Sequence, residues 1–137
     1  MAELILILGG ARSGKSAYAE RLARERGGAV LFVATATAGD DEMARRIAAH
    51  RAERPAEWRT LEAPADGAAR VAAADPAGTI LLDCVTLLVS NLLLAHEAAG
   101  EDAVAAAVAG EVERLLALAA SDAATRIIVS NQVGMGL

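Results

Sequence analysis

A short segment near the amino terminus has the residue types and spacing of a phosphate-binding loop. Residues 9–16 match the pattern G-x-x-x-x-G-K-[ST], with its lysine at Lys15 and its serine at Ser16. Glycines let backbone N–H groups approach phosphate oxygens without clashes from a Cβ atom. The lysine can reach the terminal phosphates, and the serine hydroxyl can be a ligand of Mg²⁺. The motif predicts that the chain binds a nucleoside triphosphate and that Lys15 has a catalytic role.

The segments on either side of this motif are those that a phosphate-binding loop requires. Residues 4–8 form an apolar run with the composition of a buried parallel strand, and residues 15–26 are expected to form a helix. The amino-terminal end of such a helix carries a partial positive charge that favours a bound anion. The alternative is a glycine-rich turn that binds nothing, and the flanking strand and helix make it the weaker interpretation.

The rest of the chain alternates apolar runs with helical patterns. Further strands are predicted at 29–35, 58–61, 79–82 and 126–130, and further helices at 40–52, up to about residue 74, at 86–98 and at 101–120. Strands that alternate with helices are typical of a parallel sheet covered on both faces. We therefore expect an α/β fold, a P-loop NTPase-like three-layer sandwich with a mostly parallel sheet. Residues 1–137 are expected to form a single nucleotide-binding domain.

An aspartate stands at the end of one predicted strand. Asp83 directly follows the apolar run 79–82, where phosphate-binding proteins carry a carboxylate that orients Mg²⁺ directly or through water. Ligands of open parallel sheets sit beyond the carboxyl ends of the strands, so we also expect Thr35 to lie near the nucleotide. The alternative for Asp83 is an aspartate that only caps the next turn. Its neighbour Cys84 is expected to fill space in the core and not to be a nucleophile.

The predicted helix at 40–52 is basic toward its end, around His50. Three acidic residues at 40–42 precede the arginines, so pairs such as Glu42 with Arg46 can form on a solvated face. Spacing alone favours that structural interpretation. The alternative is a phosphate-handling site, because the histidine lies among arginines and is close in sequence to the strand at 29–35.

Composition excludes several classes of protein. The chain has 137 residues and a net charge of −5, which argues against a general nucleic-acid binder. Its single cysteine excludes an internal disulfide and suits a reducing compartment. No apolar run has the length of a bilayer span, and the first ten residues lack a basic leader. We therefore expect a cytoplasmic protein with no membrane span and no nucleic-acid partner.

Several blocks, taken in order, resemble one family of cobalamin biosynthesis. They are the loop at 9–16, Val-Ala-Thr at 33–35, Asp-Asp-Glu-Met at 40–43, His-Arg-Ala-Glu-Arg-Pro-Ala-Glu-Trp-Arg-Thr at 50–60, Leu-Asp-Cys-Val-Thr at 82–86, Ser-Asn-Leu at 90–92 and Ser-Asn-Gln-Val-Gly at 130–134. In this order they resemble the bifunctional adenosylcobinamide kinase / adenosylcobinamide-phosphate guanylyltransferase. The block at 50–60 is the specific part, because it is far rarer than a phosphate-binding loop.

The resemblance implies a two-step enzyme whose substrates include ATP and GTP. It would phosphorylate adenosylcobinamide, and then pass GMP from GTP through a histidine to adenosylcobinamide phosphate. The histidine implied is His50, which reverses the interpretation from spacing, and a neutral imidazole is a competent nucleophile near pH 7. Family members are also similar in forming homotrimers. The nucleotide contacts implied are Gly9, Gly10, Ala11, Arg12, Ser13, Gly14, Lys15, Ser16, Ala34, Thr35, Ala36, Arg51, Ala52, Glu53, Arg54, Glu62 and Asp83.

The chain departs from the family pattern in two ways. Gln132 stands where the family usually has a glutamate, so a charge that could serve the kinase reaction is lost. Members of the family also continue beyond residue 137 through another helix and a final strand. Two other functions therefore stay open: a simple P-loop small-molecule kinase that uses Lys15 and Asp83 alone, and a truncated nucleotide-binding module without turnover.

Overall fold

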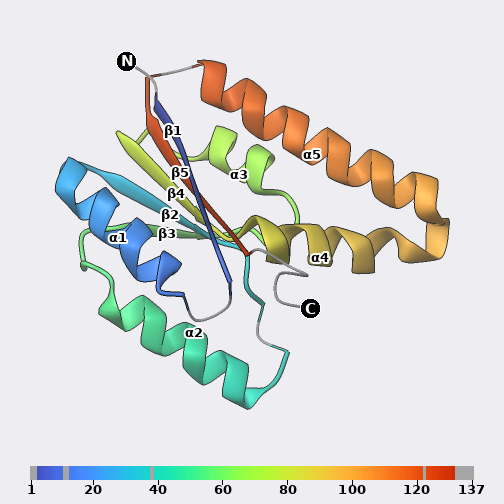
Figure 1. Cartoon of the computed structure of the whole chain (residues 1–137), viewed down its shortest axis with the longest axis horizontal. Coiled ribbons are helices and arrows are strands. Elements are labelled where there is room, and N and C mark those ends of the chain that lie inside the picture. Colours follow the sequence, from blue (N-terminus) through green and yellow to red (C-terminus); the bar gives the residue numbers. More distant parts are fainter. Residues whose placement is uncertain (1–2, 11–12, 38, 122, 132–137) are drawn as a thin grey trace.

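A five-stranded sheet forms the centre of the molecule (Figure 1). The structure is a computed structural model that describes residues 3–10, 13–37, 39–121 and 123–131. All strand pairs in the sheet are parallel, and the strand order is β1-β5-β4-β2-β3. The strands are β1 (Glu3–Gly9), β2 (Val30–Ala34), β3 (Arg59–Glu62), β4 (Thr79–Asp83) and β5 (Thr125–Asn131).

Helices connect successive strands and cover the sheet. They are α1 (Lys15–Arg26), α2 (Asp41–Glu53), α3 (Gly67–Ala73), α4 (Val85–His96) and α5 (Glu101–Ser121), with a 3₁₀ turn at Glu97–Ala99 between the last two. Every strand and helix predicted from the sequence is present, with ends that agree to within two residues. The prediction of an α/β fold with a parallel sheet is confirmed.

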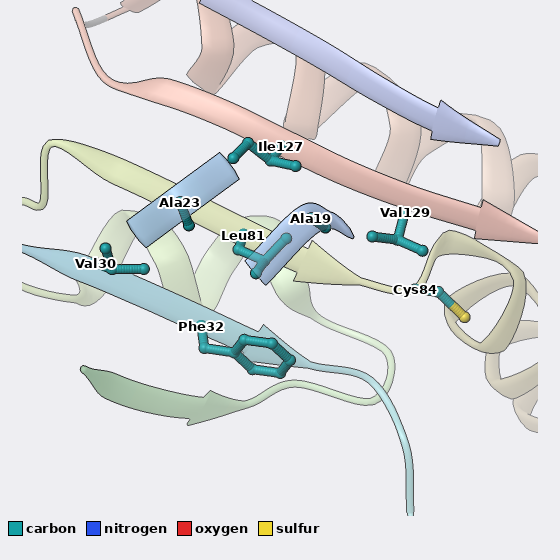
Figure 2. Close-up of a cluster of buried hydrophobic side chains, with 8 residues drawn as sticks. All are labelled: Ala19, Ala23, Val30, Phe32, Leu81, Cys84, Ile127 and Val129. Carbon is teal, nitrogen blue, oxygen red and sulfur yellow. The ribbon is translucent and has the colours of Figure 1, made fainter. Parts of the chain in front are cut away.

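Two apolar cores lie on opposite faces of the sheet, because successive residues of a strand point to opposite faces. In β2, Phe32 contributes to the core on the α1 side, whereas Val33 contributes to the core on the other side. Figure 2 shows the first core, which consists of Ala19, Ala23, Val30, Phe32, Leu81, Cys84, Ile127 and Val129. The second core includes partly buried residues of α3 and α5, so helices cover both faces and the expected three layers are present.

The prediction that residues 4–8 form a buried strand is wrong for one face of β1. Leu4, Leu6 and Leu8 are 50%, 58% and 53% exposed, whereas the alternate residues Ile5 and Ile7 pack against the first core. The reason is the position of β1 at the edge of the sheet, where β5 is its one partner among the described strands. A cavity of about 250 Å³ separates Leu4 and Leu6 from the apolar sides of α4 and α5.

One side of α5 also differs from the prediction. The helical spacing of the apolar residues predicts one buried side made of Val104, Val108, Val112, Leu115, Leu116 and Leu118, yet Val112 and Leu116 are 40% and 53% exposed. The residue that α5 buries most fully is instead a charged one, Glu111. Its Oε1 accepts a hydrogen bond from the Ala68 N–H at 2.7 Å, and its Oε2 lies 3.3 Å from Arg114 Nη2. This carboxylate therefore serves the amino-terminal end of α3, where free N–H groups need acceptors.

Candidate functional site

The loop between β1 and α1 places the phosphate-binding motif at the carboxyl end of β1. Lys15 Nζ donates a hydrogen bond to the Gly10 carbonyl oxygen at 3.1 Å. Gly14 has φ of +81°, a left-handed conformation that favours glycine. A Cβ atom at Gly9 would lie 2.5 Å from Ser13 Oγ, so a larger residue at the first glycine of the motif would displace the Ser13 side chain. Ala11 and Arg12, two predicted nucleotide contacts, lie outside the described residues.

The carboxyl ends of β2 and β4 lie side by side and are joined by Thr35. Ala34 pairs in register with Asp83, and Thr35 immediately follows. The fully buried Thr35 hydroxyl accepts a hydrogen bond from the Cys84 N–H at 2.7 Å and donates to the Cys84 carbonyl oxygen at 2.8 Å. Asn91 Nδ2 donates to the Thr35 carbonyl oxygen at 2.9 Å. Thr35 thus holds the strand end that carries Asp83, and its expected contact with the nucleotide stays a prediction.

A cavity of about 180 Å³ lies beyond these strand ends, between the sheet, α1 and α2. Six predicted site residues line it: Ser16, Ala34, Ala36, His50, Arg54 and Asp83. The structure therefore brings the end of the phosphate-binding loop, the strand-end aspartate and the basic helix to one place. Four more residues line the cavity without having been predicted: Glu20, Phe32, Ile47 and Leu87.

Two features of helix α2 position His50 and Arg54: a capped first turn and the helical spacing of its residues. The Asp40 side chain accepts a hydrogen bond from the Met43 N–H at 2.7 Å, which fixes the first turn. Ile47, His50 and Arg54 then follow at spacings of three and four residues, which places them on one face of the helical path. The imidazole of His50 is exposed in the last turn and is accessible to a ligand in the cavity.

Arg54 is held by two neighbours that carry no charge. Its guanidinium carbon lies 3.7 Å from the centre of the Phe32 ring, and its Nη1 donates a hydrogen bond to Thr60 Oγ1 at 3.1 Å. Burial lowers the pKa of Arg54, while the nearby carboxylates of Glu20 and Asp83 oppose that change. An arginine side chain keeps its positive charge at neutral pH, so the cavity contains a half-buried cation.

Glu20 is the titratable group of this cavity that sequence reasoning missed. It lies four residues after Ser16 on α1, and this i, i+4 spacing is the signal that could have revealed it. Burial raises the pKa of its carboxyl group, and Asp83 adds to the rise, whereas Arg24 and Arg54 oppose it.

Several predicted nucleotide contacts do not line this cavity. Gly9, Ser13, Gly14 and Lys15 line a separate hollow of about 540 Å³ on the outer side of the phosphate-binding loop. Arg51 and Glu62 are exposed and lie 4.0 Å apart as an ion pair, and Ala52 and Glu53 are exposed at the end of α2. The carbonyl oxygen of Gly10 accepts the hydrogen bond from Lys15. The roles of these residues toward a nucleotide stay predictions.

The thiol of Cys84 has the properties of a core residue, as expected. It is buried in the core below α1, and burial raises the pKa of the thiol, which disfavours the reactive thiolate.

The end of β5 adds a polar group beside the phosphate-binding loop. Asn131 pairs in register with Gly9, and its N–H donates a hydrogen bond to Thr86 Oγ1 at 2.8 Å. Its buried side-chain oxygen Oδ1 has no hydrogen-bond partner among the described residues. The neighbouring Gln132 lies outside them, so the effect expected from its lost charge stays a prediction.

Ser16 and Asp83 fit a magnesium ion that a nucleotide brings with it. The described part of the chain contains no group of three or more His, Cys, Asp or Glu residues that could hold a metal alone. Ser16 and Asp83 line the same cavity and offer a hydroxyl and a carboxylate oxygen. Mg²⁺ prefers oxygen ligands and usually takes most of them from water and phosphate, so two protein ligands suffice.

Comparison with known proteins gives a match over nearly the whole chain. Residues 5–137 match the model of a family described as cobinamide kinase / cobinamide phosphate guanyltransferase. The bifunctional adenosylcobalamin biosynthesis protein CobP of Pseudomonas aeruginosa is 53% identical over 133 residues, which cover 96% of this chain and 73% of that protein. The proteins named CobU from Escherichia coli and Salmonella typhimurium are 39% and 41% identical, over 98% of this chain and 77% of each relative.

A solved structure supports the fold separately. The KaiC-like protein PH0186 of Pyrococcus horikoshii aligns with a TM-score of 0.50 over 98% of this chain and 65% of its own, at 16% identity. Identity this low is evidence for the fold alone. Among the described helices, none combines the length and the apolar character needed to cross a membrane.

Proposed function

Since this chain belongs to the cobinamide kinase / cobinamide phosphate guanyltransferase family, we propose that it performs both reactions at the cavity lined by Ser16, His50 and Asp83. The substrates are adenosylcobinamide and then adenosylcobinamide phosphate, with ATP or GTP as the phosphate donor and GTP as the GMP donor. The observation that carries the proposal is the shared cavity: a histidine faces the same space as the end of the phosphate-binding loop.

The first reaction is a phosphoryl transfer. The hydroxyl oxygen of adenosylcobinamide attacks the γ-phosphorus of the triphosphate and loses its proton, while the bond from that phosphorus to the bridging oxygen breaks and the nucleoside diphosphate leaves. Lys15 and the backbone of the loop hold the phosphates, and the dipole of α1 favours their charge. Bound at Ser16 and Asp83, Mg²⁺ would supply further neutralisation of the phosphate oxygens.

The second reaction uses His50 as a nucleophile. A nitrogen of its imidazole attacks the α-phosphorus of GTP, forming an N–P bond while the bond to pyrophosphate breaks. An oxygen of adenosylcobinamide phosphate then attacks the same phosphorus and releases His50, so one difficult displacement becomes two easier ones. Arg54, half-buried in the same cavity, is placed to offset the charge of the phosphate groups.

The proposal extends to the setting in which the enzyme works. We place it in the cytoplasm, where nucleoside triphosphates are abundant and the free Cys84 stays reduced. We propose that residues 1–137 act as one nucleotide-binding domain and that the enzyme is a homotrimer, as the family resemblance implies. The exposed position of His50 in α2 is compatible with a neighbouring subunit close to the site.

Intact-protein mass spectrometry after incubation with GTP and Mg²⁺ tests the function. We expect a covalent GMP adduct that disappears on acid treatment, as a phosphoramidate should, and that is absent from His50→Ala. An adduct that persists in His50→Ala would show that His50 is not the nucleophile.

Other outcomes favour the other two functions. Phosphorylated adenosylcobinamide without any protein adduct would indicate a simple small-molecule kinase. Nucleotide binding measured by calorimetry, with neither an adduct nor product, would indicate a binding module without turnover.

A further inference from the structure

We infer that Phe32 and Thr60 are positioning residues for Arg54, which they hold as a fixed cation, without an ion-pair partner among the described residues, for the phosphates of the nucleotide. The inference rests on the proposed function, which places GTP in the cavity that Arg54 lines. It deepens that function because it gives Phe32 and Thr60, neither of them among the predicted contacts, a role in recognising the triphosphate.

The sheet brings the two positioning residues together. Phe32 in β2 and Thr60 in β3 are direct partners in the parallel register, so their side chains point to the same face of the sheet. Phe32 is on the α1 side, where Figure 2 shows its ring among the residues of the first core. The ring and the hydroxyl therefore form one surface on which the guanidinium rests, 3.7 Å from the ring centre and 3.1 Å from the oxygen.

The two arginines of α2 that form ion pairs, Arg46 and Arg51, are held differently. Arg46 lies 3.6 Å from Glu42, and Arg51 lies 4.0 Å from Glu62, and all four side chains are mostly exposed. Arg54 forms no ion pair with any carboxylate among the described residues, although it is the more buried arginine. A carboxylate partner would cancel its charge, whereas an aromatic face and a hydroxyl fix the group and leave the charge for a ligand.

The donors of Arg54 are also left largely available. A guanidinium has five N–H donors in a planar fork, and the Thr60 hydroxyl accepts from Nη1 alone. Contact with the Phe32 ring fixes the plane of the fork without using any donor. A planar fork with free donors is suited to bidentate contact with phosphate oxygens, which a lysine cannot reproduce.

Calorimetry with GTP and Mg²⁺ tests the inference in a His50→Ala background, where covalent transfer cannot occur. We expect Phe32→Leu, Thr60→Val and Arg54→Lys each to weaken GTP binding roughly tenfold, the scale of one charged hydrogen bond. Guanosine, which lacks phosphates, should bind all variants alike. Ile127→Val removes volume from the same core as Phe32→Leu and should leave GTP affinity unchanged.

The combined variants separate positioning from a general structural effect. If Phe32 and Thr60 act through Arg54, adding either change to Arg54→Lys should weaken GTP binding no further. Additive losses, or equal losses for guanosine and GTP, would overturn the inference. The adduct measured on the unaltered chain reports separately on the proposed function, because its absence would refute transfer while the binding data still decide the role of Phe32 and Thr60.

Discussion

His50, in the last turn of α2, and Arg54, directly after that helix, have opposite environments. The imidazole is exposed and has no hydrogen bond to any described residue, whereas the guanidinium is half-buried and held by a ring and a hydroxyl. In the proposed mechanism His50 bonds to the α-phosphorus of GTP and then releases it, and such a group benefits from freedom of movement. A group that only offsets charge benefits from being fixed in advance, because it then needs no reorganisation during the reaction. In the structure, His50 is the exposed group without a hydrogen bond to a described residue and Arg54 is the group that is held in place, which suits these two roles.

Glu20 gives a prediction about pH. Burial raises the pKa of its carboxyl group above the ordinary value of 4.5, so folding costs more free energy when the carboxyl group is ionised than when it is protonated. The stability of the folded protein is therefore not reduced by Glu20 at a pH below the unfolded pKa of this group. It falls as the pH rises through the folded pKa, because the buried carboxyl group must then ionise. We expect Glu20→Gln to be modestly more stable than the unaltered chain at pH 8, because solvent screens this half-buried group, and the difference should vanish near pH 4.

Denaturant unfolding at the two pH values measures this difference. Glu25→Gln, on an exposed position of the same helix, is the matched control for the loss of one carboxylate. A Glu20→Gln variant that is less stable than the unaltered chain at pH 8 would show that the carboxylate is stabilised by its surroundings.

The part of the site that is contiguous in sequence could be predicted, whereas contacts between separate strands could not. The phosphate-binding loop is contiguous, so Lys15 and Ser16 were identifiable from local spacing alone. Phe32 was not, because its relation to Arg54 depends on which strands pair and in which register. Thr60 belonged to a recognised block, but only the structure shows that its hydroxyl accepts from Arg54.

At the scale of the elements, Thr35 links the ends of β2 and β4. Thr35→Val keeps the shape of the side chain and removes the hydroxyl, which leaves the buried N–H and carbonyl of Cys84 without that partner. We expect a loss of about 2 to 3 kcal/mol in the free energy of unfolding, because unsatisfied buried backbone groups are costly. The measurement is the denaturant midpoint at constant m-value.

The neighbouring Thr37 provides the control. Its side chain is exposed, so Thr37→Val should change the free energy of unfolding by no more than about 0.5 kcal/mol. Equal effects at the two positions would mean that the Thr35 hydroxyl does not hold the strand ends together.

The elements themselves were predicted well because their patterns are local. Apolar runs identified β1, β2, β4 and β5, and acidic first turns identified helices such as α2. The error over β1 has a physical cause. A run of five apolar residues cannot reveal whether its strand lies in the middle or at the edge of a sheet, since strand order is a property of the complete fold.

At the scale of the whole molecule, we expect the exposed leucines of β1 to promote self-association. Monomeric proteins rarely leave a large continuous apolar patch uncovered. Leu4 and Leu6 line the same cavity as the apolar sides of α4 and α5 and form such a patch with them. For a chain of residues 1–137, we expect Leu6→Glu to reduce the binding of an apolar fluorescent dye and to lower self-association. The measurements are dye fluorescence and sedimentation at several protein concentrations.

Leu94→Glu is the matched control for that change. Leu94 is also an exposed leucine, at 67%, but it does not line the cavity between β1, α4 and α5. If the two variants reduce dye binding equally, the patch is not the cause of association.

The strand order has a consequence for the order of events during synthesis. Among the described strands β1 pairs with β5 alone, and Glu3 is the register partner of Thr125, near the end of the described chain. A growing polypeptide that has left the ribosome as far as α5 already contains the entire phosphate-binding motif, but the strand that supports it has no neighbour. Closing so long a loop costs conformational entropy, and this cost arises before the strand pairing that compensates for it, so the step is slow. We therefore expect a nascent chain to gain affinity for GTP only after β5 has been made.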